Sequence, residues 1–175
     1  IADVKNDEEV KAIMYMAESQ IEALGFTEHS VRHSGIVSKW AGEIMEAVGG
    51  TPHRIELTRI AGYLHDIGNS VNREDHAQSG AILAYKILTR MGMPYRAAAE
   101  IMMAIGNHDE GQGLPVSDIT SALIIADKAD VHKSRVRRNT TRITSDVLNI
   151  HDRVNLAAEK SGVQVDKERG EIVLN

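Results

Sequence analysis

Six histidine and aspartate residues recur along the sequence at positions where a helical stripe would otherwise hold only apolar side chains. They are His33, His65, Asp66, His76, His108 and Asp127. Imidazole nitrogens and carboxylate oxygens are the groups that bind hard and borderline cations in proteins. Because the six residues are distributed over five predicted helical segments, we expect them to meet at one site in the centre of a bundle. The pattern predicts a metal-dependent enzyme.

Each of these residues also has an ordinary structural explanation. A lone histidine on a buried stripe is more often part of the core, and His33 and His108 lie near predicted helix ends, where histidine is common. That explanation has to be invoked separately at all six positions. A buried carboxylate such as Asp127 needs a counter-charge or a metal ion. Lys128 is adjacent, but neighbouring helix positions point about 100° apart, so we expect an in-line cation to be the better partner.

The donor types narrow the choice of metal. The chain contains no cysteine, which excludes thiolate ligands and disulfides. Histidine and aspartate without thiolate favour one or two divalent transition metal ions, namely Fe, Mn, Zn, Co or Ni, and disfavour Mg.

Helical periodicity places these residues in line with apolar neighbours. On two of the predicted helices the histidine comes before its apolar stripe: His33 before Val37, Ala41, Ile44 and Val48, and His76 before Gly80, Leu83 and Ile87. On two others the candidate ligand comes after the stripe: His108 after Ala97, Ile101, Ala104 and Ile105, and Asp127 after Leu123 and Ile124. Gly80 would also allow another backbone to approach closely.

The periodicity predicts an all-α bundle of about six to seven helices with a short C-terminal β-hairpin. The helices are expected at residues 7–24, 28–48, 51–67, 75–91, 94–107, 117 into the 130s, and 145–160. Asn6 and Glu9 predict a capping box for the helix over 7–24. The stretch 106–115 is expected to be a loop and a wall or lid of the site.

The last residues predict two strands, 163–165 and 172–174, with Gly170 in the turn. An isolated hairpin is marginal in water, so it must pack on the helices, pair with another chain or be continued. This leaves a homodimer contact open. We expect one helical domain over residues 1–160 and a hairpin extension over 161–175.

Composition limits the class of protein. A chain of 175 residues with 42% hydrophobic residues can bury a core of its own, and only 3% are aromatic. The net charge of −5 argues against general nucleic-acid binding. No apolar run approaches the ~20 residues of a membrane span, and no signal-peptide pattern is present. We therefore expect a cytoplasmic protein without a membrane partner.

Three motifs occur in a recognisable order: HSGIV at 33–37, LHDIG at 64–68 and ADKAD at 126–130. Over roughly residues 28–135, this order resembles the HD-domain superfamily of metal-dependent phosphohydrolases, whose signature is H…HD…D. The resemblance implies that His33, His65, Asp66 and Asp127 bind a first metal ion.

His76 and His108 indicate a particular group of proteins within that superfamily. Its two-metal members, such as cyclic-nucleotide phosphodiesterases, HD-GYP phosphodiesterases and di-iron oxygenases, add histidines between HD and the last Asp. The resemblance thus implies a binuclear site bridged by Asp66. Some HD-GYP members bind a further metal through a Glu where this chain has His29, which leaves a ligand or supporting role open there.

The chain departs from HD-GYP proteins in several places. Asn69 stands where Lys is usual after HDIG, Asn107-His108-Asp109 stands for HHE, and GQGLP at 111–115 is only loosely similar to GYP. Cyclic-dinucleotide activity is therefore not the favoured prediction.

The predicted reaction is hydrolysis of a nucleotide or other small phosphoester by a metal-bound hydroxide. Asp66, Asp109 and Lys128 are the catalytic candidates, with Asp109, or a histidine not bound to metal, as the proton donor to the leaving oxygen. Arg73, Lys128 and Arg135 are the candidates for binding the substrate phosphate.

Two other functions use the same ligands. A di-iron oxygenase would be distinguished by a mixed-valent iron pair and oxygen consumption. A non-catalytic regulatory module is disfavoured because the chain keeps all four signature residues and two more.

Overall fold

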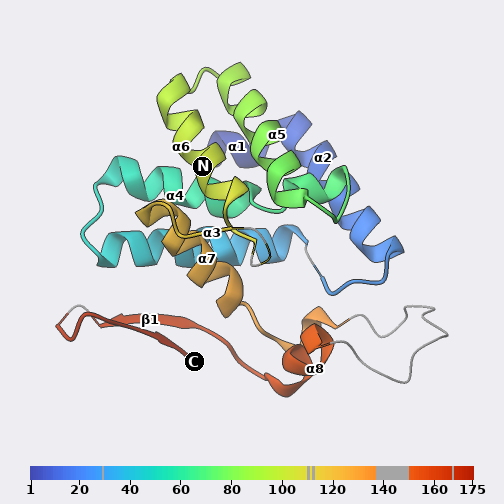
Figure 1. Cartoon of the computed structure of the whole chain (residues 1–175), viewed down its shortest axis with the longest axis vertical. Helices are drawn as coiled ribbons and strands as arrows, with labels where there is room; N and C mark the ends of the chain where they lie inside the picture. The colour runs from blue at the N-terminus through green and yellow to red at the C-terminus, as the bar shows by residue number, and fades with distance from the viewer. Residues whose placement is uncertain (29, 110, 112, 137–149, 167) are drawn as a thin grey trace.

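A bundle of α-helices precedes a two-stranded hairpin (Figure 1). The computed structural model describes residues 1–28, 30–109, 111, 113–136, 150–166 and 168–175, and of residues 150–152 only the backbone. Its α-helices are α1 (Ala2–Asn6), α2 (Glu8–Ala23), α3 (Val31–Ala47), α4 (Pro52–Leu64), α5 (His76–Arg90), α6 (Tyr95–Gly106), α7 (Asp118–Ala129) and α8 (Ile150–Ala157). Two 3₁₀ helices, η1 (Ile67–Ser70) and η2 (Lys133–Arg135), precede α5 and follow α7. The strands are β1 (Val163–Asp166) and β2 (Glu171–Leu174). The predicted fold class is confirmed, and the short α1 is an element that the periodicity did not predict.

Short polar side chains determine where the main helices begin. Asp7 accepts hydrogen bonds from two backbone N–H groups in the first turn of α2. The predicted capping box between Asn6 and Glu9 is therefore wrong, because Asn6 ends α1 and Asp7 takes the capping position. Equivalent caps begin α3, α4 and α7 at Ser30, Thr51 and Ser117.

The core lies where α3 and α4 pack side by side, α7 covers both, and α6 packs against α4, α5 and α7 (Figure 1). Fully buried aliphatic side chains fill it, among them Val37, Leu64, Ile101, Ile105 and Leu123. Val48 was predicted to extend the α3 stripe, but it is 62% exposed. It is the C-cap of α3, and the chain turns away after it at Gly49, whose φ is 87°.

A close backbone contact fixes the start of α5 against η1. A Cβ atom on Gly68 would lie 1.9 Å from the carbonyl oxygen of His76 and 2.5 Å from the backbone nitrogen of Gly80. The predicted close approach at Gly80 is confirmed. Because no side chain separates the two backbones, His76 lies directly beside the turn that carries His65 and Asp66.

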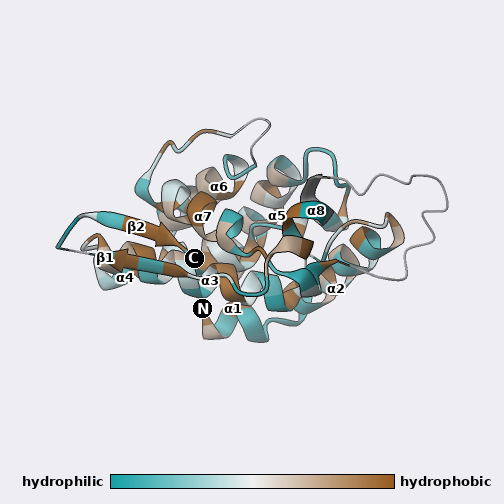
Figure 2. Cartoon of the chain, turned by 90° about the horizontal axis from the view of Figure 1, so that it is seen from below, coloured by the Kyte–Doolittle hydropathy of each residue, from teal (hydrophilic) through white to brown (hydrophobic). Residues whose placement is uncertain are grey.

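The hairpin packs on the bundle through one strand. β1 and β2 pair antiparallel with Val163 opposite Leu174 and Val165 opposite Ile172. Val163 and Val165 pack against the core, and β1 contacts α3. Apolar residues of both strands and the hydrophilic turn between them are visible in Figure 2. Ile172, Val173 and Leu174 of β2 remain exposed.

The helix predicted over 145–160 corresponds to α8, which begins at Ile150; residues 145–149 lie outside the described part of the chain. The backbone N–H of Lys133 in η2 donates to the carbonyl of Ala158 at 2.9 Å, which attaches the end of α8 to the segment after α7. In the described residues, no helix is long and apolar enough to cross a membrane.

Candidate metal centre

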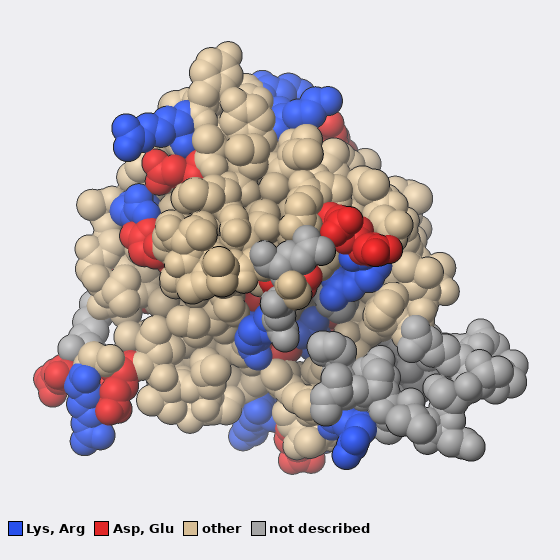
Figure 3. Space-filling view, viewed as in Figure 1, with Lys and Arg blue, Asp and Glu red and all other residues tan. Residues whose placement is uncertain are grey.

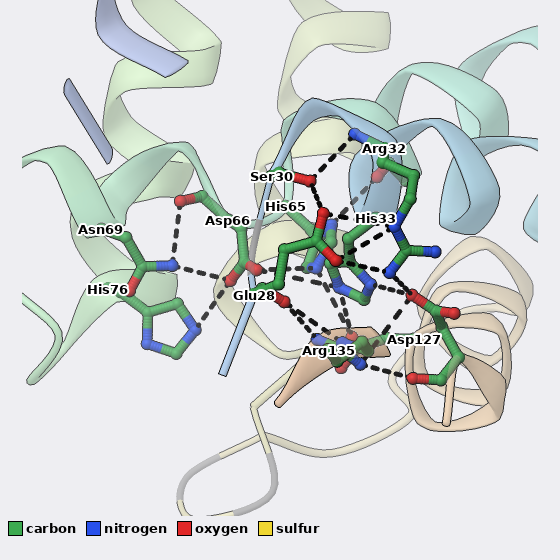
Figure 4. Close-up of polar contacts among 12 residues, drawn as sticks. Glu28, Ser30, Arg32, His33, His65, Asp66, Asn69, His76, Asp127 and Arg135 are labelled. Atoms are coloured by element: carbon green, nitrogen blue, oxygen red, sulfur yellow. Dashed lines mark hydrogen bonds and ion pairs between the residues drawn. The ribbon is translucent and has the colours of Figure 1, made fainter. Parts of the chain in front are cut away.

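The structure brings all six predicted ligands together at the centre of the bundle. His33 comes from α3, His65 is the C-cap residue directly after α4 and is followed by Asp66 in the turn, and His76 begins α5 (Figure 4). His108 lies just after α6, and Asp127 lies on α7. The imidazole centroids follow one another at 5.2 Å from His33 to His65, 5.0 Å to His108 and 5.1 Å to His76. All four histidines are buried.

Three of the imidazoles are held in one orientation by a backbone carbonyl close to them in the chain. The Nδ1 atoms of His65, His76 and His108 lie 2.9, 3.1 and 2.7 Å from the backbone carbonyl oxygen three residues earlier. A carbonyl oxygen can only accept, so Nδ1 must carry the hydrogen. In the neutral ring the lone pair is then on Nε2. This is the arrangement that metal-binding histidines use.

His33 is oriented by a carboxylate. Its Nδ1 lies 2.7 Å from Oδ2 of Asp130, which is buried. Burial raises the pKa of Asp130, but the hydrogen bond with His33 and the charges of Arg135 and Arg32 outweigh it and lower that pKa below its ordinary value. Asp130 therefore stays ionised and directs the Nε2 atom of His33 toward the site.

The two oxygens of Asp66 face different histidines. Oδ1 lies 3.4 Å from Nε2 of His76, and Oδ2 lies 3.4 Å from Nε2 of His65 and 3.9 Å from Nε2 of His33. Asn69, which is fully buried, donates from Nδ2 to Oδ1 of Asp66 at 2.9 Å and to its backbone carbonyl at 3.1 Å. The amide thus fixes the carboxylate between His76 on one side and His65 and His33 on the other.

Asp127 closes the other side of the site. Its Oδ1 lies 3.2 Å from Nε2 of His33 and 3.5 Å from Nε2 of His65. Its Oδ2 lies 2.9 Å from Nζ of Lys128. Although neighbouring helix positions point about 100° apart, the long side chain of Lys128 reaches the carboxylate; the in-line cation that we expect to be the better partner stays a prediction.

The charges of the site are unevenly distributed. Burial alone would lower the pKa of His65, but the carboxylates of Asp66 and Asp127 outweigh it and raise that pKa to about 10. Burial, followed by the charge of His65, lowers the pKa of His108 to about 4, and burial lowers the pKa of His76. Burial raises the pKa of Asp127, yet His33, His65 and Lys128 bring it well below its ordinary value. The pocket therefore favours positive charge between the two carboxylates.

Two sets of donor atoms could each hold a metal ion. One is His33, His65 and Asp127, and the other is His65, Asp66 and His108; within each set the ligand atoms lie within 4.8 Å of one another. In the described part of the chain, the Nε2 atom of His65 is buried without a hydrogen bond. A buried nitrogen that has no hydrogen bond and belongs to both sets is in the environment expected of a metal ligand.

Arg73 lies beside His76, and Asp109 is near enough for its charge to act on the same histidine. Nη1 of Arg73 is 3.3 Å from Oδ1 of Asn69 and 3.5 Å from Nε2 of His76, and the guanidinium lies over the Phe26 ring at 5.7 Å. Asp109 is half-buried, and its negative charge acts on His76. Both are therefore at the His76 side of the site, whereas Lys128 is at the Asp127 side.

Arg135, a candidate for binding substrate, forms hydrogen bonds inside the protein. It is buried, its Nη1 donates to the carbonyl of Asp130, and Nε and Nη2 donate to the carbonyl of Glu28 at 3.1 and 3.0 Å (Figure 4). These bonds tie the segment before α3 to the segment after α7. The guanidinium thus stabilises the packing of these two segments. His29 lies outside the described residues.

Two residues that shape the site, Asp130 and Asn69, have no role predicted from the sequence. Asp130 follows Asp127 by three positions, a spacing that returns to the same side of a helix and could have indicated a second carboxylate. Asn69 follows the HDIG motif directly, but its sequence position does not reveal which carboxylate its amide contacts.

The sequence profile of the HD domain matches residues 28–134, which include all six candidate ligands and Asp130. This chain belongs to the HD-domain family. An uncharacterized protein of Methanocaldococcus jannaschii is 29% identical over 136 residues, which are 65% of this chain and 52% of that protein. The HD-domain chain thus spans about half the length of this curated relative.

A solved structure is similar to the HD-domain fold found here. It is the crystal structure, at 1.45 Å, of a predicted HD superfamily hydrolase from an uncultured Thermotogales bacterium. The two share 27% sequence identity with a TM-score of 0.54, and the match covers 69% of this chain and 67% of the other. The resemblance to the HD-domain superfamily seen in the sequence is confirmed.

Proposed function

We propose that this HD-domain protein is a metal-dependent phosphohydrolase that hydrolyses a nucleotide or another small phosphoester. One observation carries the proposal. Four buried histidines are each anchored through Nδ1, and two carboxylates lie among their Nε2 atoms. Such an arrangement has few uses in a folded protein other than holding cations.

The donor set supports two ions of Fe, Mn, Zn, Co or Ni. His33, His65 and Asp127 would hold one, and His76 and His108 would hold the other. Asp66 would bridge them, because each of its oxygens faces a different group of histidines. When bound, such ions supply a hydroxide near neutral pH, since they lower the pKa of water from about 15.7 to about 7.

The remaining polar groups would bind substrate and move protons. Arg73 and Lys128, at opposite sides of the site, would bind the phosphate oxygens. Asp109, half-buried beside His76, would transfer a proton to the leaving oxygen. Arg135 is a weaker candidate for substrate binding, because backbone carbonyls already take up its donors.

The surface is consistent with a small substrate. On the face shown in Figure 3, acidic and basic side chains lie beside one another and form no extended basic patch among the described residues. A general nucleic-acid binder would present such a patch. A cytoplasmic location and a homodimer remain predictions.

The test is metal analysis followed by a substrate screen. Protein purified without chelator would be analysed by elemental mass spectrometry, and the same sample assayed on p-nitrophenyl phosphate and bis(p-nitrophenyl) phosphate. Two ions per chain with hydrolysis of either ester would support the proposal, and the preferred ester would identify a monoesterase or a diesterase. An iron pair with oxygen consumption and no hydrolysis would indicate an oxygenase instead. No binding after metal is added back would refute the site.

A further inference from the structure

Arg73 is the one positively charged side chain found against a candidate ligand on the His76 side of the site, among the described residues. Its Nη1 lies 3.5 Å from Nε2 of His76, the atom that the second ion would need. A cation and a metal ion cannot both occupy the space in front of the same lone pair.

The contacts that hold Arg73 in this place are weak and uncharged. They are the amide oxygen of Asn69 at 3.3 Å and the ring of Phe26 at 5.7 Å. Among the described residues, no carboxylate forms an ion pair with Arg73, whereas Arg32, Arg54 and Arg90 each contact two. An arginine held in this way can be displaced by a stronger anionic partner at small cost.

We propose that Arg73 competes with the second metal ion for His76, and that the phosphate of the substrate draws Arg73 away and so strengthens binding of that ion. The inference rests on the proposed two-metal site. By linkage, the ion must strengthen phosphate binding by the same factor. The second ion is then bound more tightly when a phosphoester is present, whereas binding of the first ion, at His33, His65 and Asp127, does not depend on it.

The experiment compares Arg73→Gln with the wild type and with Arg96→Gln. Arg96 is 94% exposed on α6, so its replacement changes the net charge equally without touching the site. Each protein would be titrated with Mn²⁺, with and without inorganic phosphate, and two-ion occupancy followed by electron paramagnetic resonance of the coupled Mn²⁺ pair. This readout does not depend on activity.

Without phosphate, Arg73→Gln is expected to bind the second Mn²⁺ at least about fivefold more tightly than the wild type, the lower end of typical coupling. Phosphate should strengthen the second ion less in Arg73→Gln than in the wild type and Arg96→Gln. Equal or weaker binding of the second ion by Arg73→Gln would overturn the competition, as would an equal phosphate effect in all three proteins. If the three proteins bind no second ion, or no ion at all, the two-metal site itself is wrong.

Discussion

Each of the four site histidines uses one ring nitrogen for the fold and turns the other toward its neighbours. For His65, His76 and His108 the partner of Nδ1 is a carbonyl of the same local turn, so these rings are oriented as soon as the helix ends form. His33 depends on Asp130, 97 positions away in the chain. The orientation of His33 should therefore be sensitive to substitution of a distant residue, whereas the orientations of the other three rings depend on the backbone close to them in the chain.

Asp66→Ala should remove the bound metal and leave a folded bundle of reduced stability, because both oxygens of this buried carboxylate face histidine nitrogens. Metal per chain would be measured by elemental analysis, and helix content by circular dichroism. Asp3→Ala, at an exposed position of α1, is the control. Unchanged metal content in the Asp66 variant would contradict the site.

His76→Ala combined with His108→Ala should reduce the metal count from two toward one. His76 faces Oδ1 of Asp66 and its ring packs against that of His108, and neither histidine belongs to the set formed by His33, His65 and Asp127. The variant would be compared with His53→Ala, which removes an exposed imidazole. A count that stays the same as in the wild type would exclude the binuclear arrangement.

Asp130→Asn should weaken metal binding by about 10- to 100-fold, as is typical when the partner of a ligand histidine is changed. The amide keeps the shape but loses the charge that holds the Nδ1 hydrogen of His33. Competition with a coloured chelator measures the affinity, with Asp118→Asn on the surface of α7 as the control. Equal affinities would mean that the charge of Asp130 does not serve the metal.

At the scale of elements, the site depends on how closely α5 approaches η1. Gly68→Ala should lower the free energy of unfolding by about 3 kcal/mol or more, since the new Cβ would meet backbone atoms, which cannot move aside as a side chain can. Gly35→Ala in α3 meets nothing within 4 Å and should raise it by about 0.5–1 kcal/mol. Urea unfolding measures both, and a mild effect at Gly68 would show that the contact can relax.

At the scale of the molecule, ion pairs at the surface connect elements that carry ligands. Arg54 of α4 contacts Asp118 of α7 and Glu100 of α6. The hydrogen bond from Arg54 is the largest cause that lowers the pKa of Asp118 below 3.8. The pair therefore adds stability above the pKa of the unfolded carboxyl, and this stability is lost as the pH falls through the lower folded value.

Asp118→Asn should accordingly destabilise the protein at pH 7 by less than about 1 kcal/mol, because the side chain is half exposed and screened. The difference from the wild type should shrink as the pH falls below about 4. Chemical denaturation at pH 7 and pH 3 would measure it. A difference that is equal at both values would assign the effect to helix capping instead of charge.

The sequence alone determined the longer helices, the hairpin and the six candidate ligands, but not the short α1. These follow from local periodicity, because a polar residue in line with apolar ones must enter the core wherever its helix packs. The family was also recognisable, since its motifs are contiguous in the chain.

Only the tertiary structure decided which groups surround those ligands. Asp130 reaches His33 across the bundle, Asn69 fixes Asp66, Lys128 bends back to Asp127, and Arg135 donates its hydrogen bonds to the backbone. Such pairings depend on how separate elements pack and on the rotamers of long side chains, and neither is encoded in the spacing of residues within one helix.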